Sequence, residues 1–173
     1  MIVWGGYGSS SYLGTGARYD PISDSWAVIS SEGAPSPRVS HKAMWTGTEM
    51  IIWSGSDGVR ELSSGGRYEP ATDSWTAIAP YGGWTPQAVW TGTEIVFWGG
   101  WIDIRMGGRY DSITDTWVGM SELDSPIGRG NHRAVWTGTE MIIWGGGYSQ
   151  EPQYIFPTSG GRYCASTTGK QRE

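Results

Sequence analysis

Residues 45–55, which read WTGTEMIIWSG, decide the fold of this chain. A β-prone run, Lys42 to Thr46, leads into a short turn that contains Gly47, and the apolar run Met50 to Trp53 follows. Two such runs joined by a short glycine-containing turn are typical of an antiparallel hairpin. Because every position of the second run is apolar, we expect that strand to be covered on both faces.

The same pattern recurs along the whole chain. Apolar runs that end in Trp and a glycine-containing pair begin at residues 1, 50, 95 and 141, so that they lie 49, 45 and 46 residues apart. Three further strings keep the same order: WTGTE at 45–49, 90–94 and 136–140; GARYD, GGRYE, GGRYD and GGRYC at 16–20, 65–69, 107–111 and 160–164; and DSW, DSW and DTW at 24–26, 73–75 and 115–117. A unit of about 46 residues is therefore repeated nearly four times, at approximately 1–49, 50–94, 95–140 and 141–173.

Each complete unit is predicted to form four short antiparallel strands. Between residues 42 and 78 these are expected near 42–46, 50–53, 66–69 and 74–78, with a turn at 70–73. A sheet of this size cannot bury both faces alone, so the units are expected to stack as blades around an axis in one domain, residues 1–173. Because the chain opens at a second strand and ends after a third, we expect the first and last blades to be incomplete and the strands to number fourteen.

The repeat resembles the kelch-type β-propeller family, in particular Trp-rich bacterial members with a propeller like the central domain of galactose oxidase. The resemblance rests on the double Gly after the second strand, the Tyr of the third, the Trp of the fourth, and Arg-x-x-His before the first, at Arg38 with His41 and Arg129 with His132. Two departures are Pro86, where the other units have His, and the fourth unit after Cys164, which has no strand-four Trp.

The resemblance implies an all-β, kelch-like propeller. Because kelch rings usually close with about six or seven blades, the chain is interpreted as an arc of a larger ring. Two alternatives stay open: a protomer that completes the ring by self-association, and a tight four-bladed ring. The resemblance also implies an extracellular or periplasmic location, and no signal peptide is visible at the N-terminus.

Composition excludes several classes of protein and site. The chain has 28 Gly and 9 Pro, and its longest stretch free of both is Ile22 to Glu32, which excludes long helices. A net charge of −5 with two lysines provides no basic surface for nucleic acid. Apolar runs of about four residues are far shorter than the ~20 of a membrane helix. One Cys and two His do not supply a usual zinc set, and we expect no metal or cofactor.

Residues that recur at the repeat period are assigned to the scaffold. Ten Trp fall into three columns that are expected to fill the wedges between sheets: Trp4, Trp53, Trp98 and Trp144; Trp45, Trp90 and Trp136; Trp26, Trp75 and Trp117. The periodic Arg residues are expected to stack on aromatic rings or to bond loop carbonyls (Arg18, Arg67, Arg109 and Arg162). Asp24, Asp73 and Asp115 are expected to bond local backbone amides, and His41 and His132 to be structural.

The candidate binding residues lie in the connections that differ between units. These connections, from strand two to three and from strand four to the next unit, should emerge on one face, where recognition usually resides. Aromatic rings near charged groups suit a protein or glycan ligand. The candidates are Tyr7, Tyr12, Arg60, Trp84, Trp101, Asp103, Arg105, Tyr148, Tyr154 and Phe156. The alternative is that the rings pack only their own loops.

The functional prediction is a non-enzymatic binding or scaffold module. The alternative is a carbohydrate-active enzyme of kelch type, a mutarotase or epimerase, with Glu61, Asp103, Arg60 and Arg105 as candidate groups, although no spacing forces them to converge. The copper chemistry of galactose oxidase needs several His and Tyr ligands, which this segment does not provide. No phosphate-binding loop or serine-hydrolase elbow is present.

Overall fold

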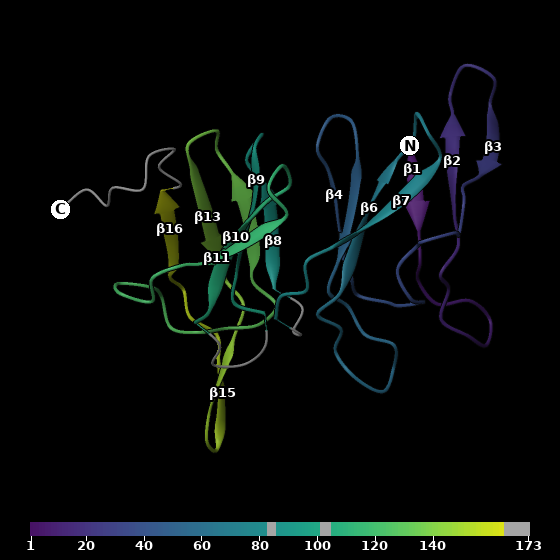
Figure 1. The fold of residues 1–173 in the computed structure, drawn as a ribbon. Helices are drawn as coiled ribbons and strands as arrows, with labels where there is room; N and C mark the ends of the chain where they lie inside the picture. The colour runs from purple at the N-terminus through teal and green to yellow at the C-terminus, as the bar shows by residue number, and fades with distance from the viewer. Residues whose placement is uncertain (83–85, 101–104, 165–173) are drawn as a thin grey trace. The chain divides into compact units, whose positions relative to one another are not determined.

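A computed structural model describes residues 1–82, 86–100 and 105–164 (Figure 1). Within these ranges the regular structure consists of sixteen β-strands, and no α-helix occurs. The predicted all-β class is confirmed for this part of the chain. The chain divides into two compact units, Met1–Thr85 and Pro86–Glu173, and each is described by itself.

Unit 1 consists of two antiparallel sheets. Sheet 1 has the order β1 (Ile2–Trp4), β2 (Gly16–Asp20), β3 (Ser25–Val28). Sheet 2 has the order β4 (Lys42–Trp45), β5 (Met50–Trp53), β6 (Gly65–Glu69), β7 (Ser74–Ile78). The four strands expected between residues 42 and 78 are therefore confirmed to within one residue at each end.

Unit 2 also contains two repeat sheets. Sheet 3 runs β8 (Gln87–Trp90), β9 (Glu94–Trp98), β10 (Gly107–Asp111), β11 (Thr116–Gly119), and sheet 4 runs β12 (Arg133–Trp136), β13 (Glu140–Trp144), β16 (Gly160–Cys164). A further hairpin of β14 (Tyr148–Gln150) and β15 (Gln153–Ile155) projects from the connection between β13 and β16 (Figure 1).

The hairpin explains why the structure has sixteen strands where fourteen were expected. Tyr148 pairs with Ile155, and Ser149 with Tyr154, so the segment builds a two-stranded ladder of its own. Among the described residues this hairpin has no counterpart in the other repeats, so the repeat pattern does not predict it.

Equivalent residues of the repeats occupy equivalent positions in the ladders. The Tyr of each third strand lies opposite the first apolar residue of the second strand: Tyr68 opposite Met50, Tyr110 opposite Ile95, and Tyr163 opposite Met141. In sheet 1, Tyr19 and Met1 exchange both backbone hydrogen bonds, at 2.8 and 3.1 Å. The sequence period is thus also a period of strand register.

The recurring WTGTE string has a local physical reason. Thr46 Oγ1 accepts a hydrogen bond from the Glu49 amide at 3.0 Å, and Gly47 takes φ of 109°, which favours glycine. Thr91 and Thr137 repeat the side-chain bond to Glu94 and Glu140 at 3.1 and 3.0 Å. The hydroxyl therefore closes each turn between the first two strands.

The core of each unit lies between its two repeat sheets. In unit 1, Trp4 and Ile29 from the side of sheet 1 pack against Met50, Ile52, Tyr68 and Trp75 of sheet 2. In unit 2, Val89, Val96 and Trp98 of sheet 3 pack against Met141 and Ile143 of sheet 4. All four residues of β5 are buried, as its uninterrupted apolar run predicts.

The expectation that all ten periodic Trp fill wedges is wrong for three of them. Trp26, Trp45 and Trp144 are 53%, 50% and 61% exposed, whereas Trp4, Trp53, Trp75 and Trp98 are buried. Register places Trp26 on the face of sheet 1 opposite to Trp4, and Trp144 on the face of sheet 4 opposite to Met141. Among the described residues no neighbouring sheet covers these two faces, whereas Trp45 shares the covered face of sheet 2 but lies on its edge strand β4.

The periodic Arg and Asp residues have partners that sequence reasoning only partly anticipated. Arg18 donates to the Pro70 carbonyl at 3.1 Å, as expected for a loop carbonyl. The other three pair with the Glu of the preceding turn: Arg67 with Glu49 at 3.7 Å, Arg109 with Glu94 at 3.6 Å and Arg162 with Glu140 at 3.8 Å. This cross-strand ion pair is a missed feature of the repeat.

The turn aspartates accept hydrogen bonds from tyrosine hydroxyls. Tyr19 donates to Asp24 at 2.6 Å, Tyr68 to Asp73 at 2.7 Å, and Tyr110 to Asp115 at 2.8 Å. Asp73 also accepts the Ser30 amide at 3.0 Å, from a connection 43 residues earlier. The expectation of purely local amide bonds is corrected for Asp73, because its carboxylate joins β7 to the segment that enters sheet 2.

Candidate functional site

Three of the ten predicted site residues, Trp84, Trp101 and Asp103, lie outside the described residues. Unit 1 contains Tyr7, Tyr12 and Arg60. Unit 2 contains Arg105, Tyr148, Tyr154 and Phe156. Since each unit stands by itself, the candidates form two groups that are treated separately.

In unit 1 the connection after β1 displays two tyrosine rings. Tyr7 and Tyr12 form an isolated antiparallel bridge, and the Gly8 amide donates to the Ser11 carbonyl at 2.8 Å. The two rings meet edge to face with centroids 5.0 Å apart, and Tyr7 is 61% exposed. The rings thus pack on each other and still present an aromatic surface to solvent.

The neighbouring connection, between β5 and β6, places charged groups beside these rings. Asp57 accepts the amides of Val59 and Arg60, both at 2.9 Å, and Arg60 Nε lies 3.6 Å from Asp57 Oδ2. The Arg60 and Val59 amides lower the pKa of Asp57, which therefore stays ionised. Tyr12 lies against Gly58, whose missing side chain and φ of 87° make room for the phenol. The structure thus brings together the loops that carry Tyr7, Tyr12 and Arg60.

A buried arginine holds the β5–β6 connection at both of its ends. The Arg38 guanidinium donates to the Ser54 carbonyl at 3.0 Å where the connection begins, and to the Ser64 carbonyl at 2.7 Å where it ends. Further bonds reach Ser64 Oγ and the carbonyl and hydroxyl of Ser36. Burial lowers the pKa of Arg38, but a guanidinium keeps its proton at any ordinary pH.

Arg129 repeats this arrangement in unit 2. Its guanidinium is buried and donates to the Gly145 carbonyl at 3.4 Å and the Ser159 carbonyl at 2.7 Å, which are the two ends of the connection that carries the β14–β15 hairpin. Sequence reasoning noted Arg-x-x-His as a motif, but it missed that the arginine positions the variable loop. The available signal was an arginine at the same place in two repeats.

The two histidines of this motif pack against tryptophans, consistent with the expected structural role. His41 meets Trp4 edge to face at 5.4 Å, and His132 meets Trp98 at 5.3 Å. Burial, followed by the charge of Arg38, lowers the pKa of His41, so its ring is neutral near pH 7. A Cβ at Gly5 would lie 2.9 Å from His41 Cε1, which explains a glycine after Trp4.

In unit 2 the projecting hairpin carries the aromatic candidates. Tyr154 and Phe156 meet edge to face with centroids 5.0 Å apart, and Phe156 is 74% exposed. Tyr148 is half-buried on β14. Arg105 is exposed just before β10, and among the described residues no hydrogen bond or ion pair joins it to the hairpin.

Glu61 is the carboxylate of the enzymatic alternative that lies within the described residues. Burial raises the pKa of Glu61, although the residue as a whole is exposed. Arg60 is engaged by Asp57. Within the described ranges no group of three or more His, Cys, Asp or Glu is arranged to hold a metal ion, and no helix is long and apolar enough to cross a membrane.

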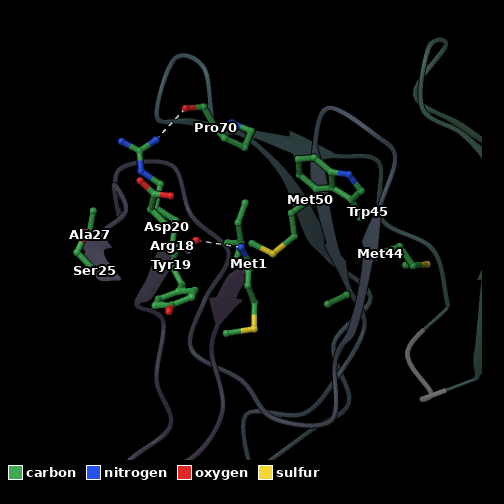
Figure 2. A pocket seen from close by; sticks show the side chains of 12 residues that line it. Met1, Arg18, Tyr19, Asp20, Ser25, Ala27, Met44, Trp45, Met50 and Pro70 are labelled. Carbon is green, nitrogen blue, oxygen red and sulfur yellow. Dashed lines mark hydrogen bonds between the residues drawn. The ribbon is translucent and has the colours of Figure 1, made fainter. Parts of the chain in front are cut away.

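A pocket of about 850 Å³ lies between sheets 1 and 2, apart from the predicted site residues (Figure 2). Its lining includes Met1, Ile2, Ala43, Met44, Trp45 and Met50, and the hydrogen bond from Arg18 to Pro70 spans the two sheets beside it. Sequence reasoning did not anticipate this pocket.

In comparisons with known proteins, no protein-family model and no curated protein matches the chain.

Proposed function

We propose that the chain is a segment of a kelch-like β-propeller, an arc of a larger ring, that binds a ligand without catalysing a reaction. Small antiparallel sheets with a shared register, each packed on a neighbour through aromatic faces, support this architecture. The proposed setting is extracellular or periplasmic, which follows from the family resemblance alone.

One observation carries the binding role: each of two buried arginines fixes both ends of a loop. Arg38 holds the charged loop that contacts Tyr12, and Arg129 holds the loop with Tyr154 and Phe156. Loops that are tied at their bases lose less conformational freedom when they bind. Exposed rings on such loops are therefore suited to recognition rather than to packing alone.

The size of the aromatic groups favours a glycan over a protein. Each group displays two rings, whereas each side of a stable protein interface buries about 800 Å². A sugar needs one apolar surface for its ring face and a few polar groups for its hydroxyls. In unit 1, Tyr7 would supply the surface, and the Asp57–Arg60 pair would supply hydrogen bonds.

A glycan array tests this proposal. We expect wild-type protein to bind a defined set of glycans, and we expect the loop variants Tyr7→Ser and Tyr154→Ser with Phe156→Ser to lose members of that set. Ile113→Ser is the control, because it removes an exposed apolar side chain at a turn outside these loops. A blank array, or binding unchanged in every loop variant, would refute glycan recognition and leave a protein ligand as the alternative.

The structure gives one observation for the enzymatic alternative, the burial that raises the pKa of Glu61. A mutarotase or epimerase would show turnover of a sugar that Glu61→Gln abolishes. A blank turnover screen with reducing sugars would count against this alternative.

We also propose that copies of the chain associate through two faces that no neighbouring sheet covers among the described residues, which we call the uncovered faces. Tyr19 and Trp26 of sheet 1 correspond in the repeat to Tyr68 and Trp75, the face through which sheet 2 packs on sheet 1. On sheet 4, Ile142 and Trp144 correspond to Ile2 and Trp4, the face that receives sheet 2. The two uncovered faces are therefore the two halves of a contact that unit 1 already contains.

A further inference from the structure

The free edge of β1 is the starting point for an inference about a second binding site. Met1 and Tyr19 exchange both of their backbone hydrogen bonds. Because bonding alternates along an antiparallel pair, the N–H and C=O groups of Ile2 and Trp4 point away from β2, toward the opposite edge. Among the described residues, no strand pairs with that edge.

Sheets 2 and 3 have a strand at the corresponding edge. β4 pairs with β5, and β8 pairs with β9, so that each of these sheets has four strands where sheet 1 has three. In β4, Ala43 lies opposite Ile52 and Trp45 lies opposite Met50. The repeat thus shows what a strand at the edge of β1 would look like.

The pocket of about 850 Å³ lies beside this edge (Figure 2). Met1 and Ile2 of sheet 1 line it on one side, and Ala43, Met44, Trp45 and Met50 of sheet 2 line it on the other. Its lining is mainly apolar, so a ligand with a hydrophobic side chain would gain free energy by entering it.

Unit 2 shows the same place in an occupied form. There β12 lies against β8, and Ala134 and Trp136 pack on the core cluster that contains Val89. The equivalent residues of sheet 2, Ala43 and Trp45, are exposed to solvent. The pocket therefore occupies the position relative to β4 that β8 occupies relative to β12.

We propose that this pocket accepts an extended peptide segment from a repeat unit of a second copy of this chain. The segment adds to β1 as the fourth strand of sheet 1. The segment would carry the four-residue pattern of β4, β8 and β12. This pattern is a polar residue, then Ala, then Val or Met, and then Trp, as in KAMW, QAVW and RAVW. Main-chain bonds to the edge of β1 would supply affinity, as in other cases of strand addition.

The repeat also assigns the register and the residue that confers specificity. By analogy with β4 on β5, the Trp of the added strand lies opposite Met1 and its Ala lies opposite Val3. The Val or Met between them then points into the pocket, as Val89 points into the core of unit 2. This proposal does not depend on ligand binding by the variable loops.

A peptide-binding experiment tests the inference. The probe is a fluorescein-labelled peptide of residues 130–137, GNHRAVWT, and its matched control carries Asp in place of Val135. Fluorescence anisotropy with dilute wild-type protein should show saturable binding of the first peptide and at least about tenfold weaker binding of the second.

A variant of the protein tests whether the peptide binds in the pocket. Ala43→Arg fills the space that the strand would take and should weaken binding of the native peptide at least about tenfold. Ala77→Arg, at an exposed position of β7 and outside the lining, is the control and should bind like wild type. Tyr154→Ser with Phe156→Ser should also leave peptide binding unchanged, which separates this site from the proposed loop site.

Three results would overturn the inference: no saturable binding, equal binding of the Val and Asp peptides, or binding unaffected by Ala43→Arg in a folded protein. If Ala43→Arg does not fold, as judged by circular dichroism, the comparison of the two peptides on wild-type protein decides.

Discussion

The ring centroids of Trp75 and Trp4 lie 5.6 Å apart, and their indole planes are tilted by 59° to each other. This contact joins β7 of sheet 2 to β1 of sheet 1. Trp75 also packs on Tyr68 at 5.2 Å, and its Nε1 donates to the Ser30 carbonyl at 2.8 Å. One side chain of the outer strand is therefore bonded to the neighbouring sheet and to the segment that follows it. This contact is the physical basis for treating each repeat as dependent on its neighbour.

Replacing Arg38 with Lys is expected to lower the free energy of unfolding by about 3 kcal/mol, because an ammonium group cannot reach both ends of the β5–β6 connection. Urea unfolding measures the change. Arg60→Lys, at an exposed arginine, serves as the control. Equal stability of the Arg38 and Arg60 variants would show that Arg38 does not hold the loop.

The hydroxyl of Tyr68 gives a prediction about alkaline pH. Burial, together with the hydrogen bond to Asp73, raises the pKa of Tyr68 to about 12 from the usual 10.0. Because the unfolded state loses this proton first, the contribution of Tyr68 to stability is complete below pH 10 and is lost as the pH rises toward 12.

Urea unfolding between pH 9 and pH 12 tests this expectation about Tyr68. The free energy of unfolding of wild type should fall more steeply over that range than that of Tyr68→Phe, which has no proton to lose. Ultraviolet difference titration should show a tyrosine that ionises near pH 12 in wild type and is missing from Tyr68→Phe. Parallel pH profiles of the two proteins would contradict the assignment.

Self-association is expected to depend on Trp26 and Trp144, the exposed rings of the two uncovered faces. Light scattering coupled to size exclusion should show a mass that rises with wild-type concentration. Trp26→Asp or Trp144→Asp should hold the mass at that of one chain, because a charge would be buried in the contact. Ile113→Asp, at an exposed turn residue, is the control. A wild type that stays monomeric at every concentration would refute head-to-tail association.

The strands and their register could be predicted from the sequence because their causes are local. Thr46, Gly47 and the apolar run from Met50 define a hairpin through turn chemistry and side-chain pattern, and the same hairpin recurs two more times along the chain. Agreement between repeats replaced the information that a set of related sequences would carry.

The burial of the repeated tryptophans could not be predicted in the same way. Trp26 and Trp75 occupy equivalent places in their repeats, yet one is exposed and the other is buried. Their surroundings differ because the neighbouring sheet, which no local pattern encodes, is present for one and not for the other among the described residues.

The candidate site was predictable in composition and less so in geometry. The exposed rings of Tyr7, Tyr154 and Phe156 lie in variable connections, as expected. The contact between Tyr12 and Gly58, and the bonds of Arg38 to both ends of a loop, join residues far apart in the chain. Such contacts depend on how two connections pack against each other, and the sequence of either connection alone does not predict this packing.

Urea unfolding of Trp75→Ala and Trp26→Ala tests most directly whether contact between neighbouring sheets stabilises this chain. We expect Trp75→Ala to lower the free energy of unfolding by about 3–5 kcal/mol, since it opens a cavity between sheets 1 and 2. Trp26→Ala should cost about 1 kcal/mol or less, because its ring is half exposed. Equal losses for the two variants, or a larger loss for Trp26→Ala, would contradict the account.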